Sequence, residues 1–272
     1  MKKFLAIMLS ALLLLTFVAC SPDEDLIDED DMAAADNTYT NNDGLGTFTY
    51  DINRDGHYSI TGYNTVSSSK HEITIPSEID DIKVTGIAAE AFKSCTNLTA
   101  VTIPESVTFI DELAFYGCDS LTALTIPASV TEIGTGAFRE CENLKTISLS
   151  ANLTELADQL FWGCAALEAI EIPAAVTAIG EATFWECDAI AEVAIPAAVK
   201  TIGNTAFYGC DALAKISVPA SVETIGEAVF TSLASETVEF TTPAGSAFAT
   251  YFAENYAGNN EPDFPGYKLI AE

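Results

Sequence analysis

A 23-residue repeat constrains the fold of this chain more than any other feature of its sequence. A phenylalanine recurs at that interval seven times, and a cysteine follows three residues later in the first six copies. Columns of Leu, Val, Ile and Pro keep the same step. One such unit cannot bury its apolar residues alone, but stacked units share a continuous core. The phenylalanine column consists of Phe92, Phe115, Phe138, Phe161, Phe184, Phe207 and Phe230.

Within each unit, the pattern L-x-x-V-x-I has the spacing of a leucine-rich repeat strand. Successive strands should pair in parallel, about 4.8 Å apart, and form a sheet on one face. The Pro that follows most of these segments ends the strand, because it cannot donate to the ladder. The A-F-x-x-C stretch is expected to form a short helical turn on the opposite side. We therefore predict a leucine-rich-repeat solenoid.

The repeat consensus, I-G-x-x-A-F-x-x-C-x-x-L-x-x-I-x-I-P-x-x-V-x-x, resembles the BspA-type leucine-rich repeats of bacterial and protist surface proteins. The resemblance covers about residues 47–257, and the Phe, Cys, Pro and Ile columns agree together. Pro occupies the neighbourhood where commoner leucine-rich repeats place a ladder-forming Asn. The resemblance implies an adhesin or surface antigen that binds host or neighbouring-cell proteins, although a fold does not by itself define a function.

Segments at both ends depart from the repeat, as terminal units of solenoids do. A β-hairpin-like lead-in (47–63) and a first unit with a five-residue insertion (75–87) precede the array, and helical spacing of aromatic residues in 245–256 predicts a C-terminal capping helix. The expected organisation is a signal peptide at 1–19, a lipidated Cys and acidic disordered tether at 20–42, the lead-in and atypical first unit at 43–86, the array at 87–240, and the cap at 241–272.

The first twenty residues are typical of a bacterial export signal. Two lysines precede an apolar run, residues 4–18, that is too short for a spanning helix. Phe-Val-Ala-Cys, ending at Cys20, resembles a lipobox with Phe in place of the usual Leu. The resemblance implies acylation of Cys20. An ordinary signal peptide followed by a chance Cys is the alternative.

The segment after Cys20, Ser21 to Asn42, is acidic and has no basic residue, so it should remain extended. Its start resembles the acidic export tag of surface lipoproteins in Gram-negative bacteria, and a plain solvated tether is the alternative. These features together predict a lipoprotein of the bacterial outer membrane, exposed on the cell surface.

The charge of the chain argues against several classes of partner. Forty Asp and Glu residues against eleven Lys and Arg residues give a net charge of −29. Phosphate binding needs a positive field, so nucleic acid is not an expected partner. Attraction to an anionic membrane surface is disfavoured for the same reason. The N-terminal lipid is therefore the only membrane contact that we expect.

Six cysteines share one column of the repeat. Neighbours in that column would lie within disulfide distance, but their Cβ vectors would run nearly parallel, so we expect buried free thiols and keep disulfides as the alternative. No C-x-x-C pair exists and neither His lies in the array, so no metal or cofactor is expected. Asp51–Gly56 matches half of a calcium loop, but Gly62 replaces the closing carboxylate, which favours a hairpin turn.

The residue directly after each Phe forms a second column, and this column is rich in aromatics. If Phe points inward, its neighbour should point outward. Exposed aromatics with an Arg among them are typical interface anchors, and they can also stack on sugar rings. The alternative is that each ring lies over the neighbouring turn and serves as packing. The candidate ligand-binding residues are Tyr116, Arg139, Trp162, Trp185 and Tyr208.

The sequence contains no nucleophile elbow, zinc-protease motif or phosphate loop. The strongest carboxylate pairing is Glu171 with Glu192, expected on adjacent strands, where two solvated charges are the simpler interpretation. We therefore expect a non-enzymatic, adhesin-like surface protein that recognises extracellular or host proteins. The alternatives are a carbohydrate-binding accessory protein that uses the aromatic column and a hydrolase that uses the carboxylate pair.

Overall fold

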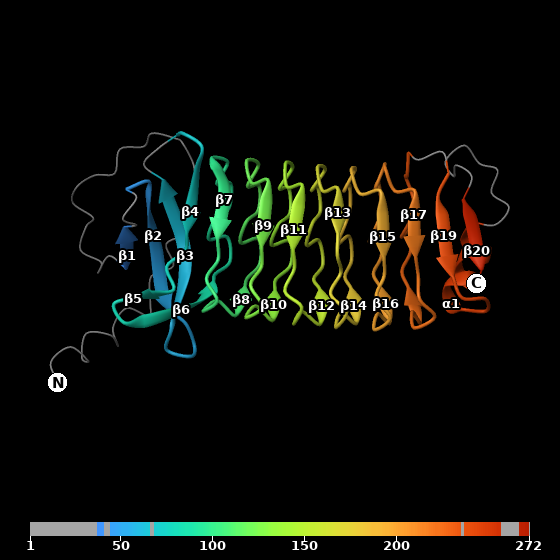
Figure 1. Ribbon diagram of the computed structural model, residues 1–272, viewed down its shortest axis with the longest axis horizontal. Helices are drawn as coiled ribbons and strands as arrows, with labels where there is room; N and C mark the ends of the chain where they lie inside the picture. Colours follow the sequence, from blue (N-terminus) through green and yellow to red (C-terminus); the bar gives the residue numbers. More distant parts are fainter. Residues whose placement is uncertain (1–36, 41–43, 66–67, 235–236, 257–266, 272) are drawn as a thin grey trace.

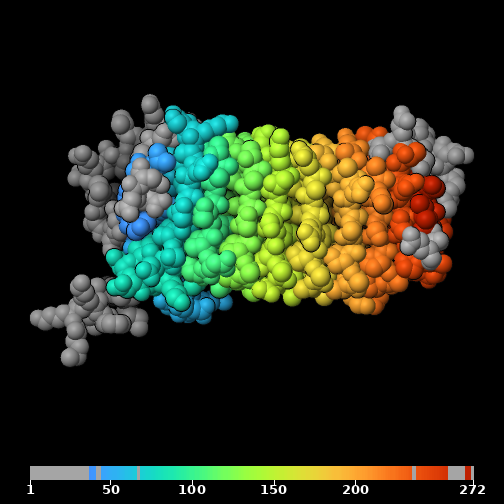
Figure 2. Space-filling view, in the orientation of Figure 1, coloured from blue at the N-terminus to red at the C-terminus, as the bar shows by residue number. Residues whose placement is uncertain are grey.

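In the computed structural model, each 23-residue unit makes one turn of a β-solenoid, and the turns stack along the long axis of the molecule (Figure 1). Figure 2 shows the same turns as successive bands packed against one another. The structure describes residues 37–40, 44–65, 68–234, 237–256 and 267–271. The expected signal peptide, Cys20 and most of the acidic tether lie outside the described residues.

The predicted parallel strands form one row along the solenoid. Partners are offset by one repeat, as in the pairing of Thr146 with Ala123 and with Ala169. At β19 the offset is 24 residues, because Glu239 pairs with Lys215, so the register slips by one residue where the regular array ends. The row comprises β4 (His71–Thr74), β7 (Leu98–Thr102), β9 (Ala123–Thr125), β11 (Thr146–Ser148), β13 (Ala169–Ile170), β15 (Glu192–Ala194), β17 (Lys215–Ser217), β19 (Glu239–Thr242) and β20 (Lys268–Ala271).

A second row of parallel strands, which the sequence analysis did not anticipate, runs along another face. Each strand has two residues, too few to show an alternating pattern in the sequence. The row consists of β8 (Phe109–Ile110), β10 (Glu132–Ile133), β12 (Glu155–Leu156), β14 (Ala178–Ile179), β16 (Thr201–Ile202) and β18 (Thr224–Ile225). Its first member, β8, pairs with β6 (Ile82–Ile87), so the row continues into the N-terminal sheet.

The A-F-x-x-C segments form consecutive hydrogen-bonded turns between each strand of the second row and the next strand of the first row. Within a unit, the Cys95 N–H donates to the Phe92 carbonyl at 3.1 Å. Between units, the Phe92 N–H donates to the Ala114 carbonyl at 2.7 Å. The backbone ladder therefore continues around the turns, and this satisfies polar groups that would otherwise be buried without partners.

The phenylalanine column fills the centre of the solenoid. All seven rings are 0% exposed. Successive ring centres lie 4.9 to 5.8 Å apart with nearly parallel planes. This spacing follows from the strand spacing of about 4.8 Å, because a residue at a fixed place in each unit repeats at that distance.

The cysteine column lies beside the phenylalanines. Five of its members, from Cys118 to Cys210, are free and fully buried. Each of these thiols donates to the carbonyl of the phenylalanine 26 residues earlier, as Cys164 Sγ does to Phe138 at 3.1 Å. Burial raises the pKa of Cys187 well above its usual value. Cys95 is disulfide-bonded, so the expectation of six free thiols is wrong at the N-terminal end of the column.

The N-terminal lead-in is a sheet of its own before it joins the second row. β1 (Thr38–Thr40) pairs antiparallel with β2 (Gly46–Ile52), and β2 pairs with β3 (Tyr58–Thr65). β1 lies inside 20–42, which corrects the expectation that the whole of that segment is a disordered tether. Its alternation of Thr and Tyr suits a strand. A two-strand hairpin, β5 (Glu78–Ile79) with β6, occupies the five-residue insertion.

The turn between β2 and β3 accounts for the half calcium loop. The Asn53 side-chain oxygen accepts from the N–H of Asp55 at 3.1 Å and from that of His57 at 3.2 Å. Gly56 has a φ of +77°, a left-handed conformation that favours glycine. The structure therefore shows the hairpin turn that the sequence favoured.

The C-terminal end of the core is covered by α1 (Ala247–Asn255), the predicted capping helix. The Ser246 hydroxyl caps it by accepting from the Ala249 N–H at 3.1 Å. Phe248 and Phe252 are buried against Phe240 of β19. Among the described residues, no helix has the length and apolar content needed to cross a membrane.

Candidate ligand-binding ridge

The five candidate residues Tyr116, Arg139, Trp162, Trp185 and Tyr208 form one continuous stack, which we call the aromatic ridge. The ring centres of Trp162 and Trp185 are 4.9 Å apart, and those of Trp185 and Tyr208 are 4.2 Å apart. The guanidinium of Arg139 lies 4.2 Å from the Trp162 ring centre and 5.9 Å from that of Tyr116. The structure thus brings together all of the residues that the sequence singled out.

The backbone of the turns holds the ridge residues one unit apart. The carbonyl of each accepts a hydrogen bond from the unit before it. The backbone N–H of Glu140 donates to the Trp162 carbonyl at 2.7 Å, that of Gly163 to the Trp185 carbonyl at 2.8 Å, and that of Glu186 to the Tyr208 carbonyl at 2.8 Å. Because these hydrogen bonds fix the main chain of every unit, equivalent side chains are held one unit apart and stack on one another.

Each ridge residue is half-buried, in contrast to the fully buried Phe before it. Both faces of the Trp185 ring are covered, one by Trp162 and the other by Tyr208. Trp162 is covered in the same way by Arg139 and Trp185. The tryptophans therefore present their ring edges to solvent and keep their faces for one another. The packing and the binding interpretations are both compatible with this arrangement.

Polar groups of the ridge differ in how they are held. Arg139 Nη1 donates to Gln159 Oε1 at 2.9 Å, and its Nε lies 3.6 Å from Glu140 Oε1. These contacts fix the guanidinium over the Trp162 ring. By contrast, the two indole N–H groups have no hydrogen-bond partner among the described residues. They are donors available to a ligand.

The corner that follows the ridge is acidic. Burial raises the pKa of Asp119, and the charges of Glu142 and Glu140 raise it further. Asp188 behaves alike: burial raises its pKa, with smaller contributions from Asp211 and Glu186. A row of carboxylates thus borders a strip that carries one paired cation, Arg139.

The carboxylate pair considered for hydrolysis lies at the first row of strands. Glu192 lies on β15 directly opposite Lys215 of β17. The repeat register places Ala169 on its other side, two residues before Glu171. Both glutamates are exposed, and neither is among the residues that line the three hollows along the two strand rows. They are two solvated charges, which was the simpler interpretation.

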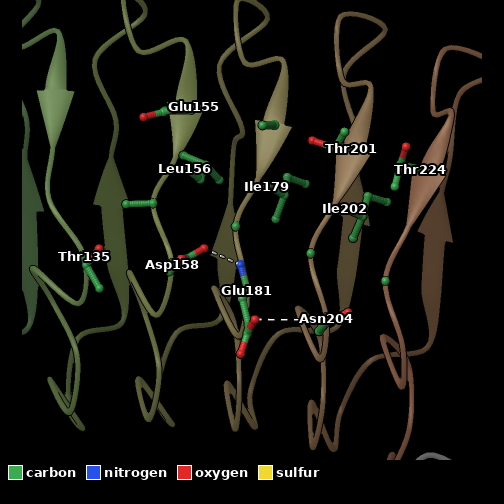
Figure 3. Close-up of a pocket in the computed structure, with 15 residues that line it drawn as sticks. Thr135, Glu155, Leu156, Asp158, Ile179, Glu181, Thr201, Ile202, Asn204 and Thr224 are labelled. Atoms are coloured by element: carbon green, nitrogen blue, oxygen red, sulfur yellow. Dashed lines mark hydrogen bonds between the residues drawn. The ribbon is translucent and has the colours of Figure 1, made fainter.

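Sequence reasoning missed a groove along the second row of strands (Figure 3). It has a volume of about 540 Å³ and is lined by residues of β12, β14, β16 and β18 and by the corner that follows each strand. Glu155, Asp158 and Glu181 contribute its charged side chains. The groove could not be found without the second row, because its walls are short strands that the repeat pattern does not reveal.

Solved structures of bacterial leucine-rich repeat proteins resemble this chain. A leucine-rich repeat protein from Eubacterium ventriosum is 27% identical, with a TM-score of 0.58, over 72% of this chain and 52% of that one. The T. pallidum leucine-rich repeat protein is 26% identical, with a TM-score of 0.45, over 71% and 82%. A leucine rich cell surface protein from Faecalibacterium prausnitzii is 22% identical, with a TM-score of 0.48, over 86% and 95%.

No curated protein matches this chain in sequence. The family described as "BspA type Leucine rich repeat region" does match, in six copies that span residues 62–191 and 179–257. These segments cover most of the chain and contain both the phenylalanine column and the aromatic ridge. The chain belongs to the BspA-type leucine-rich repeat proteins.

Proposed function

We propose that this chain is an adhesin-like binding protein of the bacterial surface and that its aromatic ridge contacts an extracellular or host protein. The family supports the general part of this proposal, because leucine-rich repeat proteins are binding scaffolds and no catalytic family matches. The observation that carries the specific part is the unbroken, half-exposed stack from Tyr116 to Tyr208.

The core does not require large side chains in this column. Thr231 occupies the same position in the seventh unit, and Lys93 occupies it in the first. Both units retain a fully buried phenylalanine, Phe230 and Phe92. The run of aromatics in the middle units is therefore additional to what folding needs, and partly exposed Trp, Tyr and Arg are the residues that dominate binding hot spots.

The orientation of the rings favours a protein over a glycan. A sugar stacks on the open face of an aromatic ring, but Trp162 and Trp185 have both faces covered. Ring edges carry partial positive charge, and together with free indole N–H groups they suit backbone carbonyls or aromatic faces of a protein partner. The carbohydrate-binding alternative therefore lacks the open tryptophan faces on which a sugar ring would stack.

Replacing both tryptophans with alanine tests the ridge. In a pull-down of extracellular proteins, Trp162→Ala with Trp185→Ala should abolish capture, since a hot-spot Trp is worth about 2 kcal/mol or more. A matched control, Glu192→Ala with Lys215→Ala, removes two side chains from the first strand row and should leave capture intact. Unchanged capture by the tryptophan variant, with an unchanged denaturation midpoint, would move the ligand elsewhere. A glycan array with the same proteins tests the carbohydrate alternative.

Anchoring is the second part of the proposal. The lipobox-like sequence ending at Cys20 and the acidic segment after it support attachment by N-terminal acyl chains to the outer membrane. Cys20→Ser should release the protein from the membrane fraction. Equal partitioning of the variant and the wild type, or a disulfide at Cys20 in the mature protein, would refute lipidation, because an acylated cysteine cannot form a disulfide. Protease shaving of intact cells then tests whether the protein faces outward.

A further inference from the structure

The groove over the second strand row has a definite chemical character. Its wall is the outward side of β12, β14, β16 and β18, and its floor is the corner where each unit turns after its strand (Figure 3). A smaller hollow of about 250 Å³, lined by Glu132 of β10, adjoins it and shares Glu155 with it. The two together run across five consecutive units.

Glycines at the corners of this groove allow successive units to stack closely. A Cβ built on Gly203 would lie 2.5 Å from the Glu181 nitrogen, and one on Gly226 would lie 2.4 Å from the Asn204 nitrogen. Gly180 would clash similarly with Asp158. The corners of successive units thus approach backbone to backbone. The glycines are explained by this close stacking.

Carboxylates line the groove without counter-charges. Glu132, Glu155, Asp158 and Glu181 form no ion pair with any described residue, and neither hollow is lined by a Lys or Arg. Lys200, which precedes β16, is paired with Glu223 at 3.1 Å. Four like charges along a concave surface focus a negative field on whatever enters it.

The spacing of these carboxylates suits a chain of charges better than a single ion. They come from successive units, which repeat about every 4.8 Å. Among the described residues, no three acidic, His or Cys side chains are close enough together to hold a metal ion. Asp158 is also committed to the fold, because its Oδ1 accepts from the Glu181 N–H at 2.6 Å. A ligand that matches this pattern carries several positive charges in a row.

We propose that this groove binds an extended, basic peptide segment of a partner protein, lying along the solenoid axis with its Lys or Arg side chains directed to Glu132, Glu155 and Glu181. Five units give a length of about 19 Å, which is the span of about six residues in an extended chain. The hydroxyls of Thr201 and Thr224, at the C-terminal end of the groove, are able to bond the peptide backbone. This site is separate from the aromatic ridge and does not depend on it.

The test uses a fluorescein-labelled ten-residue peptide of alternating Lys and Ser, with fluorescence anisotropy as the measurement. Glu155→Gln with Glu181→Gln should weaken binding by about tenfold at an ionic strength of about 0.15 M. The control, Glu171→Gln with Glu192→Gln, removes the same two charges from exposed positions outside the groove. It should change the Kd by less than about twofold, since exposed charges beyond a Debye length are screened.

Three results would overturn the proposal. Equal weakening by the groove and control variants would mean that the peptide responds only to the net charge of −29. An unchanged Kd in the groove variant would place the peptide elsewhere. Saturable binding of calcium chloride that is lost in the groove variant would make this a cation site. The variant Trp162→Ala with Trp185→Ala should retain peptide binding, so failure of the groove and failure of the ridge are distinguishable.

Discussion

Two aromatic columns, one residue apart in the sequence, differ in what surrounds them. The phenylalanine column and the aromatic ridge both stack at the pitch of the solenoid, with ring centres 4.9 to 5.8 Å apart in the first and 4.2 to 4.9 Å apart among the aromatic members of the second. The phenylalanines are 0% exposed and unbroken through seven units. The ridge is half-exposed, and the same column continues beyond it with Lys93 at one end and Thr231 at the other.

The comparison teaches that stacking alone does not distinguish packing from recognition in a solenoid. Any residue repeated at a fixed place in the unit meets its own copies, whether it points inward or outward. What differs is the desolvation: an inward ring is removed from water on every side, whereas an outward ring keeps an edge for a partner. The free energy of unfolding should therefore depend strongly on the first column and weakly on the second.

The largest expected effect compares Phe161→Ala with Trp162→Ala. Phe161→Ala should lower the free energy of unfolding by about 3–5 kcal/mol, because a buried ring is lost and a cavity remains. Trp162→Ala should cost only about 1 kcal/mol, the scale of an aromatic stacking contact on a partly exposed surface. Urea denaturation of both variants measures the difference. Equal losses would show that the ridge is part of the core.

A smaller effect is expected in the cysteine column, on the buried side. Cys164→Ala should lower the free energy of unfolding by about 1 kcal/mol, because it leaves a small cavity and removes the hydrogen bond from the thiol to the Phe138 carbonyl. Cys164→Ser, which keeps a donor at that place, is the comparison variant. Urea denaturation of both, beside wild type, separates the two contributions.

Labelling provides an independent check of the same column. Native protein should react slowly with a maleimide, because burial raises the pKa of these thiols and blocks access to them. The five free cysteines should become reactive in denaturant without a reductant. Rapid labelling of the native protein would contradict the buried column.

On the exposed side, the contact of Arg139 with Trp162 should contribute less. Arg139→Met keeps the length of the side chain but removes the cation, and should lower the free energy of unfolding by about 0.5–1 kcal/mol. It should also change the fluorescence emission of the tryptophans, because a charge 4.2 Å from the Trp162 ring is lost. Arg139→Lys retains the charge without the planar group, so its free energy of unfolding should lie between those of the wild type and Arg139→Met. Identical spectra for all three proteins would show that the stack is not formed in solution.

The smallest effect concerns the acidic corner beside the ridge. Folding raises the pKa of Asp188, chiefly by burial, so its carboxylate destabilises the native state above that folded pKa. The penalty diminishes as the pH falls from the folded pKa towards the unfolded value and is absent below both. Asp188→Asn should therefore raise the denaturation midpoint slightly at pH 7 and have no benefit near pH 3. Glu171→Gln, an exposed change outside this corner, is the control for the loss of a single negative charge.

Much of the fold could be predicted because the repeat makes each position visible several times. The parallel strands, the buried Phe column and the capping helix with Phe248 and Phe252 were all predicted from spacing, and the structure confirms them. The second strand row was missed because pairs such as Glu155–Leu156 are too short to alternate. The strand Thr38–Thr40 was missed because its stability comes from β2, a partner that is remote from its own composition.

The sequence predicted which residues form the candidate ridge, but not how their side chains pack against one another. The 23-residue period placed Trp162 beside Trp185 and Arg139 beside Trp162. It could not show which surface of each ring would be covered, because that depends on side-chain rotamers and on the bond from Arg139 to Gln159. The groove could not be predicted for a different reason: its carboxylates lie on neighbouring units, and the geometry of the corner between those units is set by contacts between them.

The sequence by itself determined that this chain is a stack of equal units and that each residue column repeats at the same place in every unit. That conclusion needs only a period, since identical units that cannot fold alone must share a core. Tertiary structure decided how the units meet: the backbone approach at Gly203 and Gly226 and the mutual covering of the tryptophan faces. These features arise from distances between atoms in different turns, and a periodic pattern along one chain carries no information about such distances.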